Sequence, residues 1–215
     1  MPTKEEMKIA QGIHVRECGE PLVDIRRYNK QIVVKLEETS KKMQGLKVDR
    51  CFLRDSAAIR LSLAQGFLPG KYRFKIIDGY RPLKAQKEIY KNLLKLLRKR
   101  HPEMTERELV AETDKWVSNP EKIVPPHTTG GTIDLTIVDG EGIELDMGTA
   151  VNKVDVRSYT SSRDITARAR KNRGILIKAM KKAGFVNDPM EWWHWSYGDW
   201  RWAYENKRES IYKPI

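Results

Sequence analysis

Two segments of this sequence each place a histidine close to a carboxylate, a combination that can bind and use a divalent metal. His127 is followed by a turn containing two glycines and then by Asp134, which lies in a run of β-branched residues. A charge inside such a strand is costly unless something compensates it, and a divalent cation would do so. An aspartate satisfied by backbone donors, beside a histidine in a loop, would leave the same pattern.

The second segment is Glu191-Trp192-Trp193-His194-Trp195, in which three tryptophans surround a carboxylate and an imidazole. An apolar setting raises the pKa of a carboxyl group, which suits it to proton transfer near neutral pH. In a straight strand Glu191 and His194 would face opposite sides, so a shared site requires a bend, or a strand that starts after Glu191. The alternative is an aromatic core strand with incidental polar residues.

Together the two segments supply two histidines and one carboxylate, a usual ligand set for catalytic zinc. We therefore predict one Zn²⁺ per chain, held by His127, Asp134 and His194, with the fourth position left for water. Zinc would bring the pKa of that water toward neutrality. Glu191 would then accept its proton and later pass it to the leaving amine.

A third polar segment, residues 78–82, reads Asp-Gly-Tyr-Arg-Pro. Proline restrains the residue before it to extended backbone, so we expect Arg81 at a junction between a strand and a helix. A guanidinium held there could stabilise the oxyanion of a tetrahedral intermediate. An ion pair with Asp78 that serves only the fold is the alternative.

The elements that must position these residues are strands and helices without regular βαβ alternation. Strands are predicted at 72–77, 132–138 and 192–197 from their β-branched and aromatic content. Helices are predicted at 28–46, at 55–65, from Pro82 through the stripe Ile89, Leu93 and Leu97, from the Thr105 and Glu108 capping box to 117, and from Ser162 or Asp164 to 183. Gly184 is expected to end the last helix in a left-handed conformation, and residues 151–161 are expected to form a loop.

Length and composition favour one domain. The chain has 215 residues, of which 40% are hydrophobic and 33% charged, and dividing it would leave two marginal cores. We therefore predict an α+β fold, one sheet with helices packed on it, as a single domain spanning residues 1–215. Residues 1–50 are expected to form an N-terminal extension packed on the rest.

The net charge of +12, from 41 basic and 29 acidic residues, suggests anionic partners such as nucleic acid or a cell-wall polymer. The helical spacing of Lys87, Lys91, Lys95 and Lys99 is also that of an ordinary solvated helix face. Because we recognise no motif that reads nucleic acid and no apolar stretch long enough to cross a bilayer, we predict neither a nucleic-acid nor a membrane partner. Two cysteines and an N-terminus without an apolar run predict a cytoplasmic location, although a removed leader would leave the same sequence.

Four motifs stand in the same order as in the D-alanyl-D-alanine dipeptidases of the vancomycin-resistance type, which the chain resembles from about Cys51 to Tyr204. They are Asp-Gly-Tyr-Arg-Pro at 78–82, His-x6-Asp at 127–134, Leu-Asp-Met-Gly-Thr at 145–149 and Glu-Trp-Trp-His-Trp at 191–195. The wider zinc peptidase group also includes D,D-carboxypeptidases and phage endolysins, but the 145–149 segment and the double tryptophan favour the dipeptidases.

This resemblance implies a zinc D,D-peptidase, or hedgehog-like, fold with a central antiparallel sheet. It also implies the site roles, which agree with those reasoned from the residues: zinc ligands His127, Asp134 and His194, catalytic base Glu191 and transition-state arginine Arg81. Two positions depart from the family pattern. Pro125 stands where serine is usual, and Asn152 stands at the apparent position of an acid that helps to hold the substrate's free amine. We therefore predict that Asn152 contacts the substrate and that strict D-Ala-D-Ala specificity is weakened.

The predicted function is zinc-dependent hydrolysis of a small peptide substrate, a dipeptide such as D-Ala-D-Ala. A cell-wall peptidase that acts on longer stem peptides, as a carboxypeptidase or an endolysin-like enzyme, is the second reading, which the basic charge would suit. A non-catalytic zinc-binding domain is the third. Glu191 and Arg81 count against it, because a structural metal requires neither.

Overall fold

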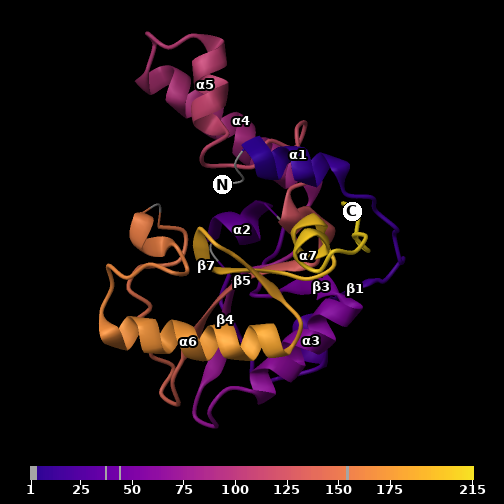
Figure 1. The fold of residues 1–215 in the computed structure, drawn as a ribbon, viewed down its shortest axis with the longest axis vertical. Helices are drawn as coiled ribbons and strands as arrows, with labels where there is room; N and C mark the ends of the chain where they lie inside the picture. The colour runs from indigo at the N-terminus through magenta and orange to yellow at the C-terminus, as the bar shows by residue number, and fades with distance from the viewer. Residues whose placement is uncertain (1–3, 37, 44, 154) are drawn as a thin grey trace.

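The computed structural model describes residues 4–36, 38–43, 45–153 and 155–215 (Figure 1). Its centre is a five-stranded sheet in the order β2-β4-β5-β7-β6. The strands are β2 (Val33–Val34), β4 (Arg73–Asp78), β5 (Thr132–Val138), β7 (Glu191–Ser196) and β6 (Val186–Asp188). All neighbours are antiparallel except β2 and β4, which run parallel. The α+β fold is confirmed, and the parallel edge pair is an addition to the predicted antiparallel sheet.

Helices lie on both sides of this sheet. They are α1 (Lys4–Gly12), α2 (Glu38–Met43), α3 (Asp55–Gly66), α4 (Leu83–Arg100), α5 (Glu106–Thr113), α6 (Ala167–Lys182) and α7 (Trp200–Glu205). In Figure 1, α3 and α6 lie on one side of the sheet, and α1 and α7 lie on the other, where α4 and α5 project away from it. A separate antiparallel pair joins β1 (Leu22–Asp24) to β3 (Phe52–Arg54). None of the helices in the described ranges is long and apolar enough to cross a membrane.

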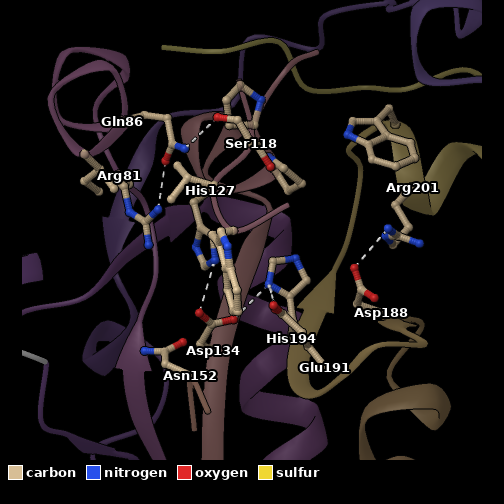
Figure 2. Close-up of a pocket in the computed structure, with 16 residues that line it drawn as sticks. Arg81, Gln86, Ser118, His127, Asp134, Asn152, Asp188, Glu191, His194 and Arg201 are labelled. Atoms are coloured by element: carbon tan, nitrogen blue, oxygen red, sulfur yellow. Dashed lines mark hydrogen bonds and ion pairs between the residues drawn. The ribbon is translucent and has the colours of Figure 1, made fainter. Parts of the chain in front are cut away.

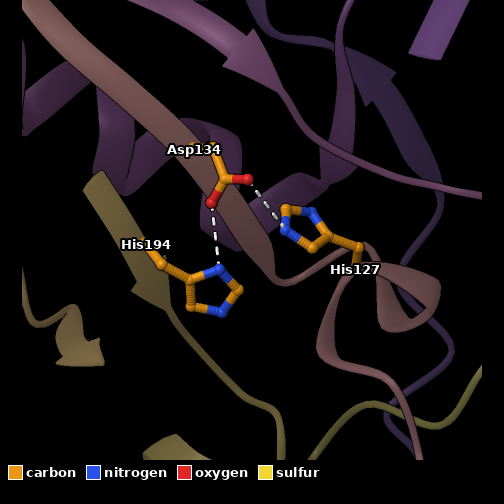
Figure 3. Close-up of side chains that lie close together, drawn as sticks. All are labelled: His127, Asp134 and His194. Carbon is orange, nitrogen blue, oxygen red and sulfur yellow. Dashed lines mark hydrogen bonds and ion pairs between the residues drawn. The ribbon is translucent and has the colours of Figure 1, made fainter. Parts of the chain in front are cut away.

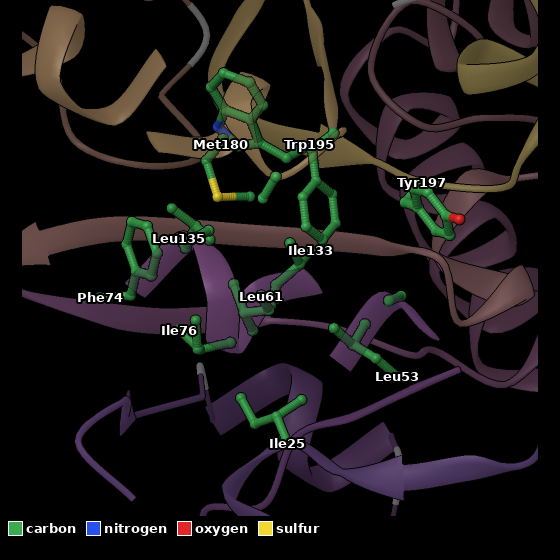
Figure 4. Packing of buried hydrophobic residues seen from close by; sticks show 14 of the residues in the cluster. Ile25, Leu53, Leu61, Phe74, Ile76, Ile133, Leu135, Met180, Trp195 and Tyr197 are labelled. Atoms are coloured by element: carbon green, nitrogen blue, oxygen red, sulfur yellow. The ribbon is translucent and has the colours of Figure 1, made fainter. Parts of the chain in front are cut away.

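Alternation along β5 separates the core from the polar face of the sheet. Ile133 and Leu135 are fully buried and belong to the main hydrophobic cluster, where they lie near Leu61 of α3 and Met180 of α6 (Figure 4). Successive side chains of a strand point to opposite faces, so Asp134 faces away from these helices. The hydrophobic packing of β5 thus determines which face carries the aspartate.

The predicted helix at 28–46, of which residues 37 and 44 lie outside the described ranges, is wrong. The segment instead contains β2 and the short helix α2. Ile32 and Leu36 are buried, as the periodicity required. The β-branched pair Val33–Val34 between them extends and pairs with β4, however, because such residues pack well in a sheet when an edge is at hand.

Other elements differ from the prediction at their ends or faces. On α4 only Leu97 of the expected stripe is buried, and Ala85, Gln86 and Tyr90 are the other buried residues. The helix projects from the sheet and packs on α5, which changes the face that it buries. Helix α6 begins after Thr166, whose hydroxyl accepts a hydrogen bond from the Ala169 amide, and not after Ser162 or Asp164.

Several local predictions are confirmed. Helix α3 occupies the predicted range, and strands β4, β5 and β7 lie within one residue of theirs. Thr105 and Glu108 form the capping box, although α5 ends at Thr113 and not at 117. Gly184 has a φ of +88°. The predicted loop at 151–161, in which residue 154 lies outside the described ranges, contains one 3-10 turn at Val156–Ser158.

Candidate active site

His127, Asp134 and His194 meet on the polar face of the sheet (Figure 3). Pairing of β5 with β7 places Asp134 opposite His194, and His127 reaches them from a 3-10 turn at Pro126–Thr129. Nδ1 of His194 lies 2.9 Å from Oδ1 of Asp134, and Nε2 of His127 lies 3.3 Å from Oδ2. One nitrogen or oxygen atom from each side chain lies within 4.8 Å of the others. The three residues can therefore share a single metal ion.

The charges of Asp134 and the two histidines favour binding of a cation between them. Burial alone would raise the pKa of Asp134, but the two imidazoles hold it well below its usual range. Burial alone would lower the pKa of His194, but Asp134 raises it to about 9. The buried carboxylate thus stabilises positive charge between itself and the imidazoles, and a divalent metal can supply that charge in place of protons. Two imidazoles and a carboxylate are donors that zinc prefers.

A backbone carbonyl orients His127. Its Nδ1 lies 2.8 Å from the carbonyl oxygen of Gly79, which directs Nε2 toward Asp134. Zinc-binding histidines usually make such a bond with the second ring nitrogen. The approach requires glycine at 79, because a Cβ there would lie 2.3 Å from Sγ of Cys51. The Arg81 amide also donates to the His127 carbonyl oxygen at 3.0 Å, which joins the two loops.

The two glycines after His127 make the predicted tight turn possible. Gly130 has a φ of +74°, in the left-handed region where a side chain is disfavoured. A Cβ on Gly131 would lie 2.1 Å from the carbonyl oxygen of Tyr197. The chain can therefore leave the histidine turn and enter β5 with Asp134 already facing His127.

The bend required for Glu191 and His194 to share a site is present. Asn187 of β6 pairs with Trp195, but the next residue, Asp188, pairs with Glu191, so the β7 strand is irregular between those positions. Glu191 is the first residue of β7, and its Oε2 lies 3.7 Å from Nδ1 of His194. Burial raises the pKa of Glu191. Its side chain remains 37% exposed, which leaves it accessible from the cleft.

Arg81 lies where strand and helix meet, as predicted. Its Nη2 pairs with Oδ2 of Asp78, and its Nη1 donates to Oε1 of Gln86 at 2.8 Å. Gln86 in turn donates to the carbonyl oxygen of Ser118. Asp78 stands opposite Asp134 in the pairing of β4 with β5. The ion pair considered from the sequence is therefore present, and it holds Arg81 beside the histidine and aspartate cluster.

One cleft, with a volume of about 160 Å³, is lined by Arg81, Gln86, Glu191 and the three candidate metal ligands (Figure 2). Pro125 and Asn152, the two departures from the family pattern, also line it. Asn152 has a φ of +60°, a conformation that asparagine tolerates better than most residues. Neither Asp146 nor Asp155, the acids nearest to Asn152 in the sequence, is among the described residues that line the cleft. Asp146 accepts bonds from Gly148 and Thr166, and Asp155 forms an ion pair with Arg157.

Reasoning from the sequence missed Gln86, Asp188, Arg201 and Arg173. The first three line the cleft. Arg173 is buried and donates to the carbonyl oxygens of Met147, Tyr159 and Arg157, which anchors these three residues to α6. A signal existed for Arg173, because an arginine on the apolar stripe of a helix needs buried acceptors. Asp188 and Arg201 flank the 191–195 motif, but nothing local indicates that they meet.

The family model that matches the chain is described as D-ala-D-ala dipeptidase, and it covers residues 27–211. A D-alanyl-D-alanine dipeptidase of Synechocystis is 28% identical over 95% of this chain and 93% of its own. Another, of Enterococcus faecalis, is 31% identical over 75% of this chain and 80% of its own. A solved structure of VanYB in complex with D-alanine-D-alanine is 15% identical, covers 83% of this chain and 85% of its own, and has a TM-score of 0.44. The chain belongs to the D-Ala-D-Ala dipeptidase family and is a zinc metallopeptidase.

Proposed function

We propose that this protein hydrolyses D-Ala-D-Ala and similar small dipeptides, using zinc held by His127, Asp134 and His194. The observation that carries the proposal is the convergence of these three donors in one cleft with Glu191. Relatives matched over most of the chain are D-alanyl-D-alanine dipeptidases. The test is release of D-alanine from D-Ala-D-Ala by the zinc-loaded protein, compared with L,D-dipeptides and muropeptides. Cleavage of muropeptides without cleavage of the dipeptide would favour a cell-wall peptidase instead.

Zinc held by His127, Asp134 and His194 would supply a Lewis acid that polarises the scissile carbonyl and acidifies water. Glu191 then accepts the proton of the attacking water and gives it to the leaving amine. Burial raises the pKa of Glu191, and a higher pKa makes its carboxylate a stronger acceptor for the proton of the water. Its position 3.7 Å from His194 keeps that exchange beside the metal ligands.

Arg81 supplies the charge that stabilises the developing oxyanion. Asp78 and Gln86 hold two of its nitrogens, so the guanidinium is oriented before the substrate binds. A donor that needs no reorganisation during the reaction stabilises the transition state more than the ground state. The ion pair with Asp78 therefore has a functional consequence.

We expect Arg81→Lys to lose almost as much activity as Arg81→Ala. Lysine keeps the charge but lacks the planar set of donors that Asp78 and Gln86 orient. The loss should fall mainly on kcat, by about 10²–10³-fold, as when other oxyanion donors are removed. Steady-state kinetics with D-Ala-D-Ala measure it, and Arg157→Lys, in an ion pair outside the cleft lining, is the control. A change confined to KM would place Arg81 on the ground-state substrate instead.

Asn152 is proposed to contact the amino end of the substrate. An ionised acid forms a charge-assisted hydrogen bond with a free α-amine, which is stronger than the bond from a neutral amide. We therefore expect Asn152→Asp to raise kcat/KM for D-Ala-D-Ala and to lower it for N-acetyl-D-Ala-D-Ala. An increase of about tenfold in the ratio corresponds to one such bond.

The ratio of the two kcat/KM values is the measurement, because it cancels changes in the amount of active enzyme. Asp155→Asn, which removes an acid that does not line the cleft, is the matched control and should leave the ratio as it is. If Asn152→Asp also leaves the ratio unchanged, Asn152 does not contact the amine.

A further inference from the structure

Four carboxylates lie on the adjacent strands β4, β5, β7 and β6, in two paired sets separated by His194, which pairs with Asp134. Asp78 pairs in register with Asp134, and Glu191 pairs with Asp188. The two inner carboxylates, Asp134 and Glu191, belong to the cluster described above. Each of the two outer ones forms an ion pair with an arginine, Asp78 with Arg81 and Asp188 with Arg201. One arginine of these ion pairs lies on either side of the three proposed metal ligands (Figure 2).

Arg201 is a buried cation that the mechanism has not used. It lies in the first turn of α7, and its side chain is only 5% exposed. Its Nη2 lies 2.9 Å from Oδ2 of Asp188, and its guanidinium carbon lies 4.9 Å from the ring centroid of Trp200. Asp188 is itself held, because the Met190 amide donates to its Oδ1 at 2.9 Å. These contacts orient the guanidinium, and Arg201 lines the same cleft as Glu191.

The chemistry of the leaving group indicates which part of the substrate lies near Arg201. Glu191 must reach the scissile nitrogen to protonate it, and in a dipeptide the carbon of the C-terminal carboxylate lies about 2.5 Å from that nitrogen. The carboxylate is therefore confined to the Glu191 side of the cleft. Among the described lining residues only Arg81 and Arg201 carry a permanent positive charge. Arg81 is held at Asp78 beside Asp134, whereas Arg201 is held at Asp188 beside Glu191.

We propose that Arg201, positioned by Asp188, binds the C-terminal carboxylate of the substrate. This inference rests on the proposed function and adds a selectivity to it. A guanidinium matches the two oxygens of a carboxylate better than any other side chain does. The subsite selects peptides whose scissile bond is the last one, because an internal peptide bond would place a neutral amide against Arg201.

The test compares D-Ala-D-Ala with its C-terminal amide. Calorimetric titration of the zinc-loaded Glu191→Gln protein gives dissociation constants for both without hydrolysis. The Glu191→Gln protein, which is the parent for the further variants, should bind D-Ala-D-Ala about 10- to 100-fold more tightly than the C-terminal amide. This is the range for a hydrogen bond to a charged group. Adding Arg201→Gln should abolish this preference by weakening binding of the acid only. Adding Arg81→Gln, the matched control on the other side of the proposed metal ligands, should preserve it.

Folding is controlled separately, because Arg201→Gln leaves Asp188 buried without its ion-pair partner. The double change Arg201→Gln and Asp188→Asn removes both charges, and it should show the same loss of preference with a thermal transition near that of the parent. Equal binding of both ligands by the parent would overturn the role of Arg201 but not the proposed function. So would a preference that survives Arg201→Gln, or one that Arg81→Gln removes. A parent that binds neither ligand would overturn the proposed function as well.

Discussion

We expect His127→Ala and His194→Ala each to lose stoichiometric zinc and, with it, peptidase activity. A catalytic site with three protein ligands cannot spare one, and the buried Asp134 is shared by both imidazoles. Metal analysis of the purified variants should therefore show well under one zinc per chain. A chelator should abolish the activity of the unmodified protein, and added zinc should restore it.

His14→Ala is the matched control for this result. The His14 side chain is 74% exposed and pairs with Glu209, outside the described cleft lining. Its replacement should leave zinc content and kcat unchanged. Full zinc occupancy in His127→Ala or His194→Ala would remove that histidine from the ligand set. The proposed roles of the other residues would then have to be assigned again.

Glu191→Gln should keep zinc and the fold but lose about 10²–10⁴-fold in kcat, the usual contribution of general acid–base catalysis. The amide has nearly the same shape as the carboxyl group but cannot accept and return a proton. Because Glu191 is not among the three proposed ligands, metal content should stay at one zinc per chain. Its kcat on D-Ala-D-Ala and its metal content, measured on the same sample, separate loss of chemistry from loss of zinc.

Glu144→Gln serves as the control, because Glu144 is half exposed and pairs with Lys75 away from the described cleft lining. A near-normal kcat in Glu191→Gln would show that another group transfers the proton. Asp188 is then the candidate to examine, since it also lines the cleft and pairs with Glu191 in the sheet. Loss of zinc together with activity would instead place Glu191 among the ligands.

Features that depend on neighbours in the chain were predictable from the sequence. The capping box of Thr105 and Glu108, the left-handed Gly184 and the strand at 132–138 all follow from preferences of residues within a few positions. The candidate chemical residues were also identifiable, since a histidine and a carboxylate in costly surroundings need a reason to be there. Their assignment as one site drew further support from the order of the motifs.

Only the tertiary structure decided which distant segments meet. Asp134 faces His194 because β5 and β7 pair in one register, and a slip of one residue would turn every side chain of a strand to the other face. The irregular pairing at Asp188 brings Glu191 to the same side, which no local preference specifies. Contacts between distant segments also explain why the predicted helix at 28–46 is wrong, because pairing with the edge of the sheet outweighed helical periodicity there.

The Asp188 and Arg201 pair shows this limit most clearly. Either residue, taken alone in the sequence, reads as an ordinary surface charge. They become a buried ion pair because β6 and α7 pack against each other at the edge of the cleft. Sequence determined the chemical groups and the local elements that carry them, because both depend on residue type and short-range geometry. Strand register and helix packing, which depend on contacts between distant segments, decided how those groups face one another.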